Sequence, residues 1–250
     1  MKIKFLFYLV FIYFFIINTG SCFAQGQISR PPKHNSTPQK TSSQMSSTTK
    51  TTTYKGKENG HDWVDLGLPS GTKWATCNIG TDDFDYYGDF FVWGNPQIIT
   101  NENIAWNKRP QYYKQDTFRG LINYDPASKL WGSKWQTPSK EQWTELIDSC
   151  IFTWTNEYDG GIWVKSKING QKIYIPACGG CTGTQGYDYP TIVGLYWTST
   201  SAPTENIYGE NVKDFAYCFS FDENQENVVR LRFLTDPRQA CLSIRPVLNK

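Results

Sequence analysis

Two cysteines three positions apart, Cys178 and Cys181 in YIPACGGCTGTQG, have a spacing that could carry chemistry. Such a pair serves as a redox centre, half of a zinc site or a disulfide. A redox pair needs its first thiol at a helix N-terminus, and the surrounding glycines disfavour a helix. Zinc needs two more ligands, and the chain has no second Cys-x-x-Cys and only two histidines. We expect a Cys178–Cys181 disulfide, with free thiols, metal binding and redox chemistry as alternatives.

The acidic segment TDDFDYYGD places Asp82, Asp83, Asp85 and Asp89 close together in the sequence. A calcium loop of the EF-hand type requires a bidentate Glu at its twelfth position. Counted from Asp83, that position is Gly94. We therefore expect a solvated loop, with an unspecialised calcium site as the alternative, and we predict no metal site and no cofactor.

Catalytic groups are harder to identify. His61 is the one histidine after residue 58, and at the start of the folded part it is expected at the surface or an edge rather than as a general base. A glycosidase would need a pair of Asp or Glu residues, and no local pattern singles out two of the 22 carboxylates there. We predict no catalytic residue, so the sequence favours a protein that is not an enzyme.

The N-terminus indicates export. Lys2 and Lys4 form a short basic region, and an unbroken apolar run follows over residues 5–17. A run of this length is shorter than the roughly 20 residues that span a bilayer. Residues 1–24 therefore read as a cleaved signal peptide, with a lipid anchor at Cys22 as the alternative. Both readings predict a protein that is secreted or held on the outer cell surface, with no membrane span in the mature chain.

A linker and one domain are expected after the signal. Residues 25–58 are rich in Ser, Thr, Lys and Pro and are predicted to be a disordered linker, with six Lys/Arg against Glu58. Residues 59–250 carry 17 Lys/Arg against 22 Asp/Glu and are long enough for one domain. An acidic domain without a basic stripe argues against nucleic acid as a partner.

One helix stands out in the folded part. WQTPSKEQWTELIDSC predicts a helix with Thr137 as its N-cap and Pro138 at the first helical position. Trp143, Leu146, Ile147 and Cys150 then recur at i, i+3, i+4 and i+7, which indicates an apolar stripe that faces the core.

Strand patterns are more numerous. The pair Asn169-Gly170 lies between two β-prone runs and predicts a hairpin, because both turn positions favour a positive φ. Apolar residues alternate with others in 215–221, 229–233 and 241–248, which look like three consecutive antiparallel strands. Long loops rich in Gly, Asn and aromatic residues connect these elements.

Five blocks resemble, in order and spacing, the domain named for the major paralogous proteins of Fibrobacter succinogenes, found in exported proteins of Bacteroides-type bacteria. The blocks are HDWVDLGLPSGTKWATCNIG, YYGDFFVWGN, WQTPSKEQWTELIDSC, GLYWTST and LSIRPVL. The resemblance covers nearly all of residues 60–250. It implies that residues 59–250 form an α+β, C-type-lectin-like domain with a twisted antiparallel sheet, one or two helices and long loops.

The resemblance predicts a fold and an extracellular location but indicates little about activity. Calcium-dependent lectins on this fold use Glu-Pro-Asn or Gln-Pro-Asp followed by Trp-Asn-Asp, and the chain contains none of these triplets. Formylglycine-generating enzymes on the fold use a cysteine pair, and the surroundings of Cys178 and Cys181 do not match theirs. Calcium-dependent sugar binding is therefore unsupported, and copper-dependent thiol chemistry is a remote alternative.

The remaining candidate is an aromatic loop surface. TQGYDYPTIVGLYWTST and TENIYGEN combine tyrosine with small polar residues, a composition typical of recognition loops. In relatives on the fold the equivalent C-terminal loops present the ligand site. The hypothesised ligand contacts are Tyr187, Tyr189, Trp197, Tyr208 and Glu210, with a core role as the alternative for Trp197.

The sequence thus favours a secreted or surface-exposed binding module that recognises a glycan or a surface protein through aromatic-rich loops. The alternatives are an extracellular carbohydrate-active enzyme and a structural or adhesive component of the cell envelope.

If these loops bind the ligand, the double variant Tyr187→Ala/Tyr189→Ala should lose saturable binding on a glycan array, because it removes two rigid stacking surfaces. Its thermal unfolding should match that of the parent chain. Unchanged binding by a folded variant would contradict the assignment of these two tyrosines.

Overall fold

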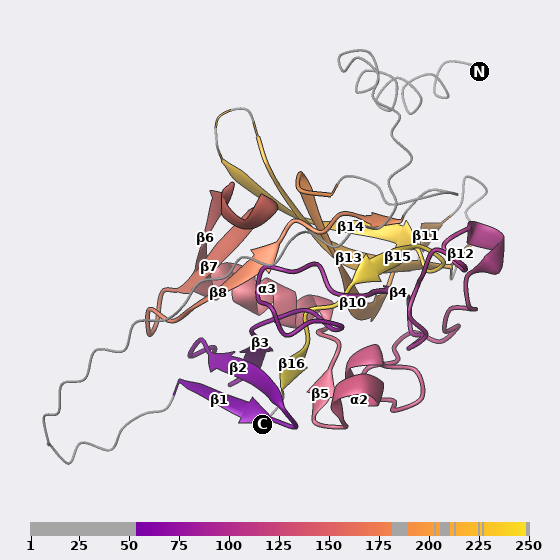
Figure 1. Ribbon diagram of the computed structural model, residues 1–250, viewed down its shortest axis with the longest axis horizontal. Helices are drawn as coiled ribbons and strands as arrows, with labels where there is room; N and C mark the ends of the chain where they lie inside the picture. Colours follow the sequence, from indigo (N-terminus) through magenta and orange to yellow (C-terminus); the bar gives the residue numbers. More distant parts are fainter. Residues whose placement is uncertain are drawn as a thin grey trace, which may run out of the picture. The chain divides into compact units, whose positions relative to one another are not determined.

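The computed structural model describes residues 54–181, 190–202, 204–205, 211–212, 214–224, 226 and 228–248. Within these ranges the regular structure is mostly β-strand (Figure 1). The helices there are two short α-helices and two single-turn 3-10 helices: α2 (Pro126–Trp131), α3 (Lys140–Ser149), η1 (Trp106–Lys108) and η2 (Glu157–Asp159).

The described strands pair into four sheets. A five-stranded sheet has the order β1 (Lys55–Glu58), β2 (His61–Asp65), β3 (Lys73–Ala75), β16 (Val247–Leu248), β5 (Trp135–Gln136). A second sheet has the order β14 (Val229–Pro237), β13 (Phe215–Glu223), β10 (Val193–Ser201), β15 (Cys241–Ser243), β4 (Phe90–Val92), and β9 (Gly180–Cys181) also pairs with β15. A three-stranded sheet has the order β6 (Cys150–Thr155), β7 (Gly161–Ser166), β8 (Lys172–Pro176). The fourth sheet is the pair β11 (Thr204–Glu205) and β12 (Asn211–Val212). Strand β1 falls inside the range that the sequence assigned to the linker.

The expected α+β, C-type-lectin-like fold is wrong for this chain. The structure is a β-rich fold with several separate sheets of mostly antiparallel strands, and its two described α-helices have six and ten residues. Many strands have only two to five residues, and the ends of β1, β2 and β4 lie within two residues of a glycine at positive φ. Short runs of this kind divide among several sheets instead of extending one twisted sheet.

The three C-terminal runs illustrate the difference. Strands β13 and β14 pair along nine residues as the alternating pattern predicts. The third run does not follow on from β14, because β15 lies on the other side of β10 and is parallel to it. Alternation reports which side of a strand is buried but not which strand lies beside it.

Helix α3 begins two residues later than expected. Its N-cap is Ser139, which forms a reciprocal capping box with Gln142. The hydroxyl of Thr137 instead donates to the carboxylate of Asp125, 2.7 Å away, and Asp125 caps α2. The apolar stripe is confirmed, since Trp143, Leu146 and Cys150 are buried and the half-buried Ile147 packs against the same core.

The predicted hairpin at Asn169-Gly170 is confirmed, with a different turn. Strands β7 and β8 pair through five residue pairs, and residues 167–171 connect them. Of the two turn residues only Gly170 has a positive φ, at 72°. A two-residue type I′ turn requires a positive φ at both of its central residues, whereas a connection of this length requires a positive φ at one residue.

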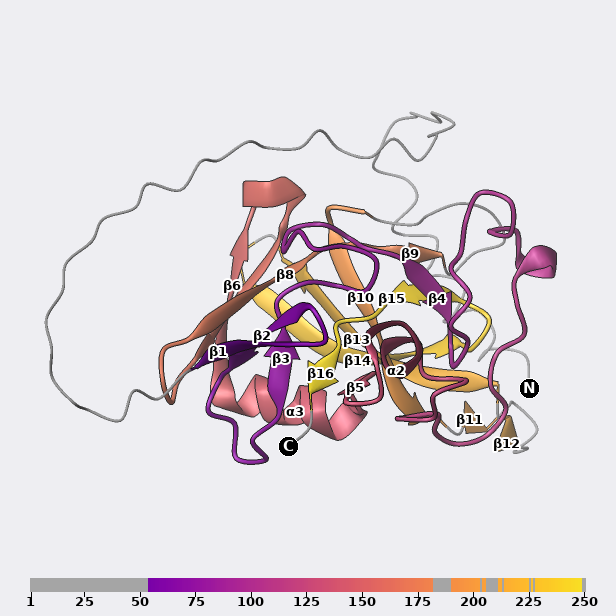
Figure 2. The same cartoon turned by 60° about the horizontal axis from the view of Figure 1, so that its bottom comes forward.

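The indole of Trp143 joins the layers of the core. It stacks on Phe219 of β13 at a centroid distance of 4.2 Å and meets Trp74 of β3 edge-on at 4.6 Å. Helix α3 therefore lies against the six-stranded sheet and also contacts the five-stranded one (Figure 2). Aromatic contacts of this geometry add about 1 kcal/mol each beyond the burial of apolar area.

The side chain of Arg238 fastens three segments that are distant in sequence. Its Nε donates to the carbonyl of Phe215, and its Nη1 donates to those of Tyr113 and Gln115 at 3.0 and 2.9 Å. The guanidinium lies 4.2 Å from the ring centroid of Trp93, and the residue is 1% exposed. One cation thus satisfies loop carbonyls that are withdrawn from water.

Replacing Arg238 by Lys should lower the free energy of unfolding by roughly 3 kcal/mol, because one ammonium is unable to reproduce the planar fork of donors at a buried site. Urea unfolding measures the change. The control Arg230→Lys alters a half-exposed arginine whose partner Asp222 keeps Arg232, and it should cost less than about 1 kcal/mol. Equal losses in both variants would contradict this role for Arg238.

Candidate functional site

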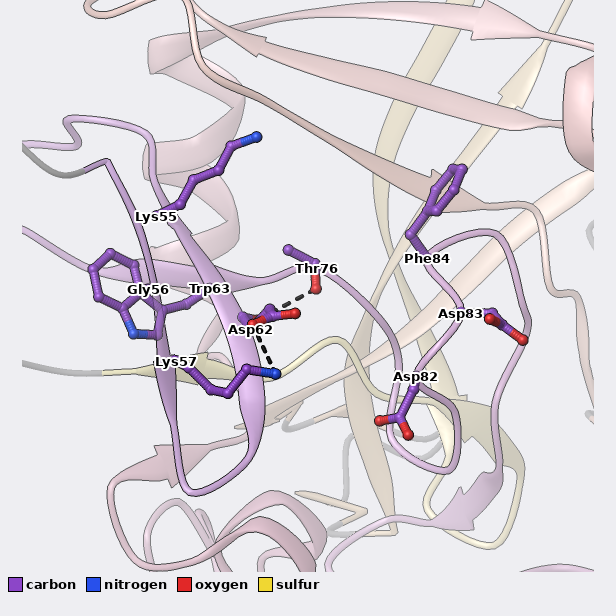
Figure 3. A pocket seen from close by; sticks show the side chains of 9 residues that line it. All are labelled: Lys55, Gly56, Lys57, Asp62, Trp63, Thr76, Asp82, Asp83 and Phe84. Atoms are coloured by element: carbon purple, nitrogen blue, oxygen red, sulfur yellow. Dashed lines mark hydrogen bonds and ion pairs between the residues drawn. The ribbon is translucent and has the colours of Figure 1, made fainter. Parts of the chain in front are cut away.

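An open groove of about 680 Å³ lies between the β1–β2 hairpin and the segment 81–84 (Figure 3). Its lining combines aromatic rings, carboxylates and lysines: Lys55, Gly56, Lys57, Asp62, Trp63, Thr76, Asp82, Asp83 and Phe84. Concave sites with a few polar groups around apolar surface are the usual form of ligand sites.

Strand pairing positions the indole of Trp63 in this groove. Trp63 lies directly opposite Gly56 in the β1–β2 register, and its ring lies against the glycine backbone. A side chain at position 56 would collide with the indole, so the glycine provides the space that the ring occupies. The ammonium of Lys73 lies 3.9 Å from the centroid of the ring, a cation–π contact.

Polar groups stand around the indole. The ammonium of Lys57 lies 3.0 Å from Asp62 Oδ1, and both side chains are more than half exposed, so the pair contributes little stability. The hydroxyl of Thr76 donates weakly to the carbonyl of Asp62 at 3.4 Å. Asp82 and Asp83 stand on the opposite side of the groove (Figure 3). These groups can donate to and accept from the hydroxyls of a polar ligand.

A second hollow of about 230 Å³ continues the groove. Both hollows share Lys55, Thr76 and Phe84, and the second adds residues of β2, β7 and β8: Val64, Trp163, Lys172, Ile173 and Tyr174. Phe84 is 39% exposed and lies between the two hollows. One surface therefore reaches from the five-stranded sheet to the β7–β8 hairpin.

An aromatic cluster supports Phe84 at this junction. Its ring contacts Tyr158 at 5.1 Å, Tyr174 at 5.9 Å and Trp163 at 6.3 Å between centroids. Tyr174 is buried, its hydroxyl donates to the carbonyl of Glu157, and burial raises its pKa. The cluster holds Phe84 while leaving part of its ring accessible.

Backbone strain occurs at the tip of the β6–β7 hairpin, next to this cluster. Tyr158 and Asp159 have φ values of 57° and 63°. A bulky residue at positive φ costs free energy and persists only where its surroundings hold it. Here the ring of Tyr158 packs on Phe84 and Tyr174. Such strain is often found at functional sites. The tip contacts the groove through the ring of Phe84.

Of the five expected ligand contacts, the described residues include Trp197 alone. Tyr187, Tyr189, Tyr208 and Glu210 lie outside the described residues and stay predictions. Trp197 lies in the core with no exposed surface, and its indole N–H donates to the carbonyl of Phe91 at 2.8 Å.

The predicted Cys178–Cys181 disulfide also stays a prediction. No disulfide joins any of the six cysteines in the described part of the chain, and all six are buried. Cys178 donates to the carbonyl of Leu195 at 3.5 Å, and burial raises its pKa. Cys181 lies directly opposite Cys241 in the β9–β15 register. Cys218 lies on β13 and Cys241 on β15, and these strands are not neighbours because β10 lies between them.

The acidic segment forms a turn-rich loop whose Asp82 and Asp83 face the groove. Across the described residues no three His, Cys, Asp or Glu side chains gather closely enough to hold a metal ion. Within the same ranges, no helix has the length and apolar character needed to cross a bilayer.

Sequence reasoning singled out Asp82 and Asp83 but missed the aromatic residues that line this groove. Trp63, Phe84 and Trp163 come from separate segments, and only the paired strands bring them together. A signal was present in GIWVKS and KIYIP, where Trp163 and Lys165 alternate with apolar residues that face the core. A partly exposed tryptophan next to a lysine on the same face of a hairpin is a candidate contact residue.

The lowered pKa of His61 predicts that the stability of the fold depends on pH. Its imidazole stacks on Trp131 at 3.8 Å, and burial lowers its pKa, although nearby Asp82 and Asp62 act in the opposite direction. The unfolded chain, with a histidine pKa near 6.5, therefore takes up a proton first. Stability should fall as the pH drops through about 6.5, and the fall ends below the lowered pKa of the folded state.

The variant His61→Phe keeps a ring on Trp131 and removes this titration. Its decrease in Tm between about pH 7.5 and 5.5 should be smaller than that of the parent chain, as followed by differential scanning fluorimetry. Equal decreases would show that another group causes the dependence.

Comparison with models of protein families, with curated proteins and with solved structures found no match to this chain. The resemblance to the Fibrobacter succinogenes paralogous domain therefore stays a prediction. The function has to be argued from the geometry of the groove.

Proposed function

We propose that this chain is an exported binding module that takes a glycan into the groove formed by β1–β2, the segment 81–84 and β7–β8. The observation that carries the proposal is the row of accessible aromatic rings, Trp63, Phe84 and Trp163, along one open surface. Aromatic faces stack on the apolar faces of sugar rings, as they do on other flat ligands with polar edges.

The polar groups of the groove support a glycan over an apolar ligand. Asp62, Asp82 and Asp83 supply acceptors, while Lys55 and Lys57 supply donors. Sugar hydroxyls both donate and accept, so a mixed lining of this kind satisfies them. The groove is open and elongated across two hollows, which suits several residues of a chain more than a compact small molecule.

The double variant Phe84→Ala/Trp163→Ala should weaken binding of the best glycan-array ligand by at least about tenfold, because it removes the two stacked rings at the junction. Isothermal titration of the full chain measures the change, with thermal unfolding as a check of folding. Trp106→Ala is the matched control, since Trp106 is a partly buried tryptophan that does not line the groove.

Other results would redirect the proposal. Unchanged binding by the double variant, with loss in Tyr187→Ala/Tyr189→Ala, would move the site to the loops expected from the sequence. Release of reducing sugar by the parent chain would favour the carbohydrate-active enzyme. A blank array from folded protein would overturn glycan recognition and make a surface protein of the envelope the next candidate.

A further inference from the structure

The outer face of the β7–β8 hairpin has an unusual charge arrangement. Lys165 of β7 and Lys172 of β8 lie directly opposite each other, and both are exposed. Like charges at opposed positions destabilise a sheet. No carboxylate within the described residues forms an ion pair with either lysine. The fold therefore retains a local excess of positive charge that its own described groups leave uncompensated.

An aromatic ring lies next to this charge. Trp163 is two residues before Lys165 on the same face of β7, and its indole is partly exposed. The ammonium of Lys172 lies 4.0 Å from the centroid of that indole. A flat apolar surface and a cation are thus presented together, within the reach of one sugar ring.

The smaller hollow adds a second cation. Lys55 and Lys172 both line it, and its lining contains no carboxylate. The larger hollow differs, because Asp62, Asp82 and Asp83 all line it. Lys55 and Phe84 stand on opposite sides of the groove with Thr76 between them (Figure 3). The charge of the groove therefore changes along its length, from mixed at one end to positive at the other.

We propose that the smaller hollow binds an acidic sugar residue, which carries a carboxylate or a sulfate. Its apolar face stacks on Trp163, and its anionic group lies between the ammonium groups of Lys172 and Lys55. The next sugar of the chain extends past Phe84 into the larger hollow, where Asp82 and Asp83 accept from its hydroxyls. This inference rests on the proposed glycan binding and specifies the class of glycan.

Matched ligands test the charge requirement. The full chain is titrated with oligogalacturonate and with alginate oligosaccharides, and with the methyl ester of each, which keeps the sugar rings and removes the charge. A sulfated galactan oligosaccharide and its desulfated form distinguish sulfate from carboxylate. We expect at least about tenfold tighter binding of one charged form than of its neutral counterpart, declining as salt is raised.

Matched variants locate the charge. Lys172→Met and Lys55→Met keep the apolar stem of the side chain and should each weaken binding of the charged ligand by about tenfold, with little effect on its neutral form. Lys129→Met changes an exposed lysine of α2 and should leave binding unchanged. Lys172→Met relieves the opposed pair but also removes the cation–π contact with Trp163, so thermal unfolding of this variant serves as the check of folding.

The outcomes separate the two proposals. Equal binding of charged and neutral forms, or equal losses in Lys172→Met and Lys129→Met, would overturn the acidic subsite. Array hits confined to neutral glycans would overturn it and leave the proposed glycan binding in place. Absence of binding to every charged and neutral oligosaccharide would overturn both.

Discussion

The fold depends on buried arginine side chains that donate hydrogen bonds to backbone carbonyls outside the sheets. Between β4 and α2 the chain runs for more than thirty residues, with one 3-10 turn as its regular structure. Two buried arginines bond to this backbone, Arg109 from within the segment and Arg238 from the chain between β14 and β15. Arg109 donates to the carbonyls of Ile104, Cys181 and Gln239, so it also ties the segment to β9 and to the approach of β15. Buried guanidinium groups thus replace the ladder that a longer strand would supply.

The groove follows from how the sheets are divided. A single extended sheet would present one continuous face, whereas here the five-stranded sheet and the β6–β8 sheet meet at an open edge. The aromatic cluster around Phe84 fills the inner part of this edge and leaves its outer part accessible. The strained tip at Tyr158 packs on the same cluster and supports Phe84, which lines both hollows.

Local features were the predictable part of the structure. The buried stripe through Trp143 and the hairpin at Gly170 depend on residues a few positions apart, where periodicity and turn preference act directly. The cap of α3 was misplaced because the hydroxyl of Thr137 bonds to Asp125, twelve residues away. The position of β15 beside β10 depends on long-range pairing that no local pattern encodes. The same holds for Trp63 and Trp163, which line two adjoining hollows. The family resemblance supplied a topology that the observed sheets do not follow.

The alternation along β7 and β8 separates side chains that pack the core from side chains that face outward. Val164 and Ile173 face the core, while Trp163, Lys165 and Lys172 face outward between them. Outward positions can change their chemistry without disturbing the packing beneath. A lineage of such proteins could therefore acquire new ligands through a few substitutions on one hairpin and keep the same scaffold. Gly56 sets the limit of this freedom, because any side chain there displaces the indole on which the other end of the groove depends.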